Sequence, residues 1–208
     1  MEKMIKKGKY IVIEGGEGCG KTTQSQLIYD YLVSKGINSI LTREPGGVEE
    51  AEKIREILKD KANDLHPLTE LFLFEAARTE FFRRVVVPNL KHDVIVISDR
   101  SGYSTEAYQG YAGEQDLNLI RHLNNLSTFD TSPDLAIIID INPRVELIKE
   151  VVNDRFSQKG LEYHIKVRKG FLEVAKRNKN CRVVSYKPGN IKGTHREIRD
   201  YVERLINA

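Results

Sequence analysis

The chain has 208 residues, of which 40% are hydrophobic and 30% are charged, a composition typical of a globular protein and not of a disordered one. Its 33 basic and 30 acidic residues leave a formal net charge of only +3, so the overall charge gives no argument for nucleic-acid binding. No apolar stretch approaches the roughly 20 residues of a membrane span, and none has the form of a signal peptide, so we expect a cytoplasmic protein that binds no membrane.

The first predicted element is a buried strand over 10–13, and a glycine-rich loop follows it directly. The loop fits the pattern G-x-x-x-x-G-K-[ST], in which glycines let backbone N–H groups converge on phosphate oxygens. The lysine of this pattern can reach the β- and γ-phosphates, and the hydroxyl can ligate Mg²⁺. Apolar residues at helical spacing over 27–32 predict a helix behind the loop, whose N-terminus adds a positive dipole. We therefore predict a nucleotide-binding loop made of Gly15, Gly16, Glu17, Gly18, Cys19, Gly20, Lys21 and Thr22.

Four further runs rich in Val and Ile predict buried strands, over 37–42, 93–98, 134–140 and 181–186. Helical patterns separate them, and the last helix is expected to begin with a capping box formed by Thr194 and Glu197. This alternation indicates a parallel sheet. We predict one domain over 1–208, a three-layer α/β fold with a five-stranded parallel sheet and helices on both faces.

The two cysteines, Cys19 and Cys181, have no metal-ligand spacing, and we expect no disulfide and a reducing compartment. Cys19 stands at a helix N-terminus, where a reactive thiol is an alternative. We favour the simpler interpretation that a small residue fits the loop at this position.

Three classes of protein use such a phosphate loop. A guanine-nucleotide switch would need an Asn-Lys-x-Asp segment late in the chain, and the sequence has none. A motor or transport ATPase remains an alternative. That class gives no reason for the arginines that follow two strands, Arg43 and Arg100, or for Arg78 on the helix between them. A small-molecule kinase must also neutralise the phosphate of an acceptor, a task that suits the arginine fork, so the pattern favours a kinase.

Several stretches resemble the thymidylate kinase family, in the family's order along the chain. They are YIVIEGGEGCGKTTQ, TREPGG, FLFEAAR, SDRSGYSTEAYQG and PDLAIIIDINP, and FLEVAKRN resumes the likeness after a less similar interval. The resemblance implies a P-loop kinase fold and transfer of the γ-phosphate of ATP to dTMP, with Mg²⁺, in dTTP biosynthesis. A kinase for other nucleoside monophosphates and an ATP-dependent switch that binds a protein partner stay open as alternatives.

The resemblance also assigns residues to the acceptor dTMP. Phe74 falls where the family stacks an aromatic ring on thymine, and Arg78, one helical turn further on, matches the arginine that reads the base edge. Tyr108 matches the tyrosine that disfavours a 2′-hydroxyl, and Thr105 and Gln109 belong to the same segment. Arg43 and Arg100 are expected to contact the acceptor as well. The alternative is that Phe74 is a core residue of an apolar helix. We assign that core role to its neighbours Leu71 and Phe72 instead.

Charged residues around the phosphates complete the expected site. Glu17 takes the acidic position of the family's loop, and we expect Arg43 or Arg100 to pair with it, since an acid among phosphates is otherwise repelled. Asp99 ends a strand, where its carboxylate can hold Mg²⁺ through water beside Thr22. We name no general base, because the attacking phosphate oxygen is already anionic. Ser101 departs from the aromatic residue or histidine that is common in the family after the Asp-Arg pair.

The segment 144–160 corresponds to the family's lid but is short and poor in arginine, and Ser157 stands where an acid is common. Because Lys21 is the one basic residue of the phosphate loop, we expect Arg155 to supply a second cation, with an arginine fork that spans two phosphate groups. The expected catalytic residues are Lys21, Glu17, Arg100 and Arg155, and the alternatives to Arg155 are Arg144, Lys149 and Lys159.

A homodimer is implied by the resemblance alone. The predicted helix LTELFLFEAARTEFF is apolar on more than one face, which suits burial against both the sheet and a partner subunit. Burial within a monomer explains the same pattern.

Overall fold

The structure is a computed structural model that describes residues 7–146, 155–156 and 159–207. Its strands are β1 Tyr10–Gly15, β2 Ser39–Arg43, β3 Ile95–Asp99, β4 Leu135–Asp140 and β5 Cys181–Ser185. Its α-helices are α1 Lys21–Ser34, α2 Glu49–Lys59, α3 Pro67–Phe81, α4 Val87–Lys91, α5 Gly102–Thr105, α6 Leu117–Ser127, α7 Pro143–Glu146, α8 Leu161–Arg177 and α9 Ile191–Ile206. Two π-helical segments, η1 Phe82–Val86 and η2 Glu106–Ala112, continue α3 and α5. None of the helices described combines the length and the apolar character that crossing a membrane requires.

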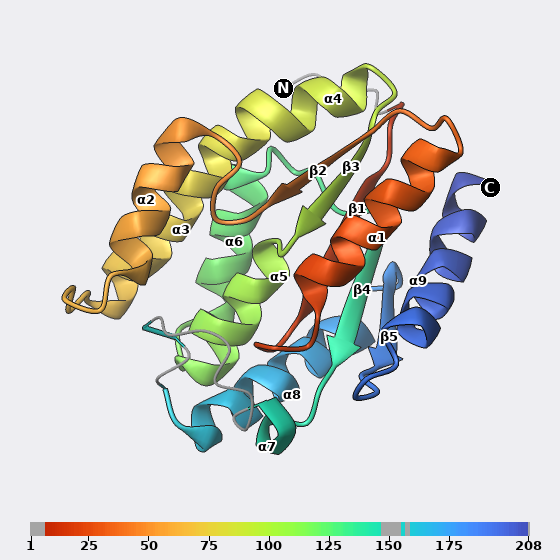
Figure 1. Cartoon of the computed structure of the whole chain (residues 1–208). Helices are drawn as coiled ribbons and strands as arrows, with labels where there is room; N and C mark the ends of the chain where they lie inside the picture. The colour runs from red at the N-terminus through yellow and green to blue at the C-terminus, as the bar shows by residue number, and fades with distance from the viewer. Residues whose placement is uncertain (1–6, 147–154, 157–158, 208) are drawn as a thin grey trace.

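The five strands form one parallel sheet in the order β2-β3-β1-β4-β5 (Figure 1). Each predicted strand overlaps an observed one, and the predicted three-layer α/β fold is confirmed. Because all the strands run the same way, their carboxyl ends meet at one edge of the sheet. There Asp99 is aligned with both Ile13 and Arg43, so the segments that follow β1, β2 and β3 converge.

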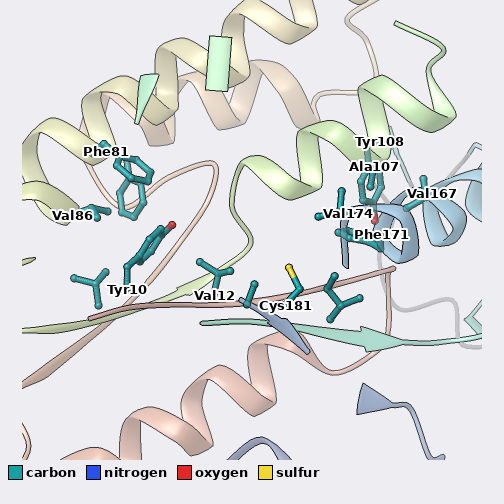
Figure 2. Close-up of a cluster of buried hydrophobic side chains, with 14 of the residues drawn as sticks. Tyr10, Val12, Phe81, Val86, Ala107, Tyr108, Val167, Phe171, Val174 and Cys181 are labelled. Carbon is teal, nitrogen blue, oxygen red and sulfur yellow. The ribbon is translucent and has the colours of Figure 1, made fainter. Parts of the chain in front are cut away.

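Alternate side chains of each strand supply two separate cores, one on either face of the sheet. Tyr10 and Val12 point from β1 toward α3, η1 and α8, as Figure 2 shows. Ile11 and Ile13 point the other way and pack against α1 and α9. These β1 side chains are at most 1% exposed, and complete burial of a Val, Ile or Phe side chain contributes about 1.5–3 kcal/mol. Burial on both faces explains why β1, β3 and β4 have continuous apolar sequences. The expectation of burial is wrong for the edge strands β2 and β5, which are partly exposed because each has a neighbouring strand on one side only.

Two sequence expectations about helices are wrong. α9 begins at Ile191 and is capped by Asn190, whose side chain accepts a hydrogen bond from Gly193 N at 3.0 Å. Thr194 therefore lies inside the helix, buried, and does not start it. Phe72 was expected in the core but is 51% exposed, because α3 turns Leu71 and Ala77 toward its neighbours and Phe72 away from them.

A glycine allows α8 to lie close against η2. A Cβ atom on Gly170 would lie 2.9 Å from Ala107 Cα and 2.9 Å from Tyr111 Cβ. Such a glycine weakens the helix by about 0.5–1 kcal/mol relative to alanine, and the close approach of the two backbones is what it permits. Since η2 carries residues of the expected acceptor site, this contact positions that site.

We expect Gly170→Ala to lower the free energy of unfolding by about 1–3 kcal/mol, because the added methyl group forces α8 and η2 apart. Denaturant unfolding measures the change. Lys169→Ala, at an exposed position of the same helix, is the control and should change stability by about 0.5 kcal/mol or less. A Gly170→Ala protein as stable as the parent would contradict the packing argument.

Candidate active site at the carboxyl edge of the sheet

A cavity of about 500 Å³ opens at the carboxyl ends of β1, β2 and β3. This is where parallel α/β sheets bind ligands. The phosphate loop forms one end of the cavity, and the aromatic side chains of Phe74, Tyr108 and Phe156 form the other. Most predicted site residues line it, namely Glu17, Gly18, Gly20, Lys21, Thr22, Arg43, Phe74, Arg78, Asp99, Arg100, Thr105, Tyr108 and Gln109. The exceptions are Gly15, Gly16 and Cys19, at the back of the loop, and Arg155.

The loop has the open backbone that a phosphate needs. Gly18 and Gly20 have φ angles of 68° and 90°, the left-handed region that favours glycine, and a Cβ atom on either would meet nothing within 4 Å. At the back, a Cβ atom on Gly15 would lie 2.5 Å from Ile139 O, so β4 approaches the loop closely there. The N-cap residue of α1, Gly20, has no side chain to cap the helix, which favours binding of an anion by its first N–H groups and positive dipole.

Lys21 lies folded over this loop and is mostly buried. Its Nζ donates a hydrogen bond to Gly16 O at 2.6 Å and lies 3.8 Å from Cys19 Sγ. Burial raises the pKa of the Cys19 thiol, which favours the interpretation of Cys19 as a small packing residue over that of a reactive thiol.

Thr22 and Asp99 place two hard oxygen atoms beside the loop. The Thr22 hydroxyl donates to Asp99 Oδ2 at 2.6 Å. Within the described part of the chain, no group of three or more His, Cys, Asp or Glu residues could hold a metal ion alone. Mg²⁺ in kinases takes one or two protein oxygens and completes its shell with phosphates and water, so this pair fits the ion.

Glu17 pairs with Arg100, one of the two arginines that the sequence proposed for it. Arg100 and the Tyr108 hydroxyl both donate to Glu17 Oε1, the hydroxyl at 3.0 Å. Burial by itself would raise the pKa of Glu17, but Arg100 and Lys21 outweigh it and lower the pKa to about 2. Arg43 binds Glu52 instead, at 3.1 Å from each carboxylate oxygen. The guanidinium of Arg100 also lies 5.2 Å from the centre of the Tyr108 ring.

Arg78 is 2% exposed and held by four acceptors. Its Nε donates to Glu44 at 2.7 Å, Nη1 to Glu75 at 2.5 Å and to Asn124 at 2.8 Å, and Nη2 to Thr105 at 2.9 Å. Burial opposes the charge, but Glu75 and Glu44 outweigh it and raise the pKa of Arg78. Since a guanidinium has one N–H on Nε and two on each Nη, the described residues leave one N–H of Nη2 without a partner.

Ser101 holds the buried carboxylate of Glu14, a residue of β1. The amide and the hydroxyl of Ser101 both donate to Glu14 Oε1 at 2.7 Å, and the Ser104 hydroxyl donates to Oε2 at 2.6 Å. Burial raises the pKa of Glu14, and these hydroxyl bonds oppose the rise. Ser101 also caps α5 by accepting from Tyr103 N at 3.2 Å. The departure from the family pattern thus supplies hydrogen bonds to an acid of β1.

Tyr108 and Gln109 lie in η2, a π-helical segment, and π-helices are frequent at functional sites. Thr105 and Gln109 are both 2% exposed, and each bonds to α3, Thr105 to Arg78 and Gln109 to Glu70. Neither residue therefore lies on an exposed helix surface.

Arg155 lies outside the cavity. It donates to the carboxylate of Glu70 and, through Nη1, to Asn63 O at 3.3 Å. Of the other proposed cations, Lys159 lies with its Nζ 4.6 Å from the centre of the Tyr163 ring, and Arg144 is exposed on α7. Lys149 and Ser157 fall outside the described residues. The structure therefore brings Arg43, Arg78 and Arg100 to the cavity but not Arg155.

Among the lining residues that sequence reasoning missed are Arg55 and Phe156. Arg55 donates to Pro45 O at 2.7 Å, and burial, with the charge of Arg43, lowers its pKa. Helical spacing could have found Arg55, which lies four residues after buried Ala51 and three before buried Leu58. No local pattern marks Phe156.

The phosphate loop, the arginines and the aromatic end of one cavity define the class of P-loop kinases that transfer phosphate to a second small ligand. A model of the thymidylate kinase family matches residues 13–198. A thymidylate kinase of Carboxydothermus hydrogenoformans is 42% identical over 204 residues, covering 96% of this chain and 98% of that protein. One of Sulfurihydrogenibium is 41% identical over 199 residues, covering 95% and 98%. The crystal structure of thymidylate kinase from Ehrlichia chaffeensis matches with a TM-score of 0.78 and 37% identity, covering 94% of this chain and 98% of that one. The chain belongs to the thymidylate kinase family.

The buried carboxyl of Glu44 generates a prediction about stability. Burial raises the pKa of Glu44 to about 7, against the opposing charge of Arg78. The folded protein therefore binds this proton more tightly than the unfolded chain does, so the stabilisation is complete below the unfolded pKa and is lost as the pH rises through about 7.

We expect Glu44→Gln to abolish the loss of folding stability that the parent shows as the pH rises. Between about pH 5 and pH 8, the free energy of unfolding of the parent should fall relative to that of the variant by about 2–3 kcal/mol. Urea unfolding at several pH values measures the difference, with Glu56→Gln, exposed on α2, as the control. A difference between parent and Glu44→Gln that does not change with pH would contradict the expectation.

Proposed function

We propose that the chain is an ATP:dTMP phosphotransferase that forms ADP and dTDP. The observation that carries the proposal is that one cavity joins an open phosphate loop to an end lined by Phe74, Arg78 and Tyr108. Membership of the thymidylate kinase family supports dTMP as the acceptor and ATP as the donor. Two buried free cysteines are compatible with action in a reducing compartment, for which we propose the cytoplasm.

Catalysis here is a matter of position and charge, since phosphoryl transfer asks little covalent chemistry of a protein. The loop and the uncapped N-terminus of α1 would hold the donor phosphates, and Lys21 would follow the charge that develops on them. Thr22 and Asp99 would hold Mg²⁺, which neutralises phosphate charge when bound. Arg100 can bind the acceptor phosphate while Glu17 keeps it oriented.

The base would lie at the aromatic end. Phe74 offers its ring for stacking, and Arg78 offers the one N–H that the described residues leave without a partner. A donor favours a carbonyl oxygen, which thymine presents, over the amino group of cytosine. Tyr108, fixed by its hydrogen bond to Glu17, would leave no room for a 2′-hydroxyl.

A coupled assay with ATP and each nucleoside monophosphate tests the proposal. We expect dTMP to be turned over best. Equal or faster turnover of AMP, GMP or CMP would point to a broader monophosphate kinase. ATP hydrolysis stimulated by a protein partner, with no monophosphate consumed, would point to a switch.

Lys21→Ala should reduce turnover of dTMP by about 100-fold or more, because a preorganised charge on the transferred group is worth several kcal/mol. The same coupled assay measures the loss, and circular dichroism checks the fold. Lys35→Ala, at the exposed end of the same helix, is the control and should stay fully active. Near-parental turnover in folded Lys21→Ala would remove Lys21 from the mechanism.

We also propose a homodimer, as the family resemblance implies. α3 and α6 pack side by side (Figure 1) and expose large apolar side chains. These are Leu68, Phe72, Leu119 and Leu126. Large apolar patches on a protein surface often mark the interface with another protein.

Phe72→Glu should convert a dimer into a monomer, because the buried charge would be unpaired at the interface. Sedimentation velocity measures the change. Val33→Glu, at an exposed position of α1, is the matched control and should leave the dimer intact. A parent protein that sediments as a monomer would overturn the proposal.

A further inference from the structure

Glu70 is a buried acid that takes no part in the cavity itself. It lies on α3, four residues before Phe74, and is 6% exposed. One carboxylate oxygen accepts from Gln109 Nε2 at 2.9 Å, and the other accepts from Arg155. Glu70 therefore ties η2 and residues 155–156 to α3, the helix that carries the expected base-stacking ring.

The residue after Arg155 is Phe156, which does line the cavity. Its ring centre lies 5.9 Å from that of Phe74 and 6.4 Å from that of Tyr108. The guanidinium of Arg155 lies 5.3 Å from the centre of the same Phe156 ring. The contact between Arg155 and Glu70 thus also positions the ring of Phe156 in the cavity wall.

Burial makes this contact a firm constraint. The side chains of Glu70 and Arg155 are 8% and 15% exposed, and removal of one partner from a buried ion pair leaves the other charge uncompensated. Arg155 has a second anchor in the carbonyl of Asn63, at 3.3 Å. Among these contacts none reaches the phosphate loop, so the geometry favours a structural role for Arg155 over a charge in the transition state.

We infer that Glu70 is a positioning residue for the acceptor site: through Arg155 and Gln109 it holds Phe156 in the wall of the cavity, beside Phe74 and Tyr108, and so contributes to the affinity for the base. This inference rests on the proposed function, because the ligand of the aromatic end is taken to be a pyrimidine nucleoside monophosphate. It makes Glu70 a determinant of dTMP binding that does not touch dTMP.

A kinetic comparison of variants tests the inference. In Glu70→Gln we expect the KM for dTMP to rise about 5-fold or more, with the KM for ATP unchanged and kcat reduced less than about 3-fold. Phe156→Leu, which leaves the Glu70–Arg155 pair intact, should show the same pattern. The double variant should be little worse than either single variant, because both act through one contact. Glu80→Gln, in a surface ion pair of the same helix, is the control.

The outcomes are distinguishable. Unchanged KM for dTMP in Glu70→Gln, or in Phe156→Leu, would overturn the inference. So would a large fall of kcat in Arg155→Ala at unchanged KM, which would assign Arg155 to the transition state. If Glu70→Gln does not fold, Arg155→Ala, which breaks the same ion pair, takes its place, with the dTMP dissociation constant from calorimetry as the readout. A parent protein that does not use dTMP would instead refute the proposed function.

Discussion

The guanidinium of Arg78 is the charge on which the proposed acceptor side of this protein depends. A buried cation costs several kcal/mol unless it is paired, so each of its neighbours must be in place at once. Those neighbours come from the segment after β2, from α3 itself, from α5 and from α6. One side chain therefore fixes four parts of the chain relative to one another, and the N–H that the described residues leave without a partner is already oriented before any ligand arrives.

The same arrangement recurs around the cavity, where each of several buried cations has an acidic partner. Arg100 pairs with Glu17, Arg78 with Glu44 and Glu75, and Arg155 with Glu70. Such pairs keep the cations in fixed places before phosphates bind, which is the preorganisation that electrostatic catalysis requires. The acids also lower the positive potential of the cavity, which weakens its attraction for other anions. Arg43 differs from these cations, because it is more exposed and its ion pair with Glu52 lies at the surface.

Packing on the sheet places these pairs. η2 holds Tyr108 and Gln109 at the cavity while its other side lies against α8, where Gly170 removes the side chain that would keep the two apart. Two consecutive residues of the π-helical segment η2 bond to different parts of the chain. Tyr108 bonds to Glu17 of the phosphate loop, and Gln109 bonds to Glu70 of α3. The donor and acceptor ends of the cavity are thus connected through two neighbouring residues of one segment.

The sequence by itself determined the parts of this protein that depend on neighbours along the chain. The strands follow from short apolar runs, and the phosphate loop from glycines whose backbone angles are a local property. The pairing of Glu17 was narrowed to two arginines, of which the structure selects Arg100. Only the tertiary structure decided which charges meet across long stretches of chain. Arg155 is 85 residues from Glu70, and Arg78 is 46 residues from Asn124. A pattern of local spacing carries no information on such partners, because they are selected by the packing of helices on the sheet and by the cost of leaving a buried charge unpaired.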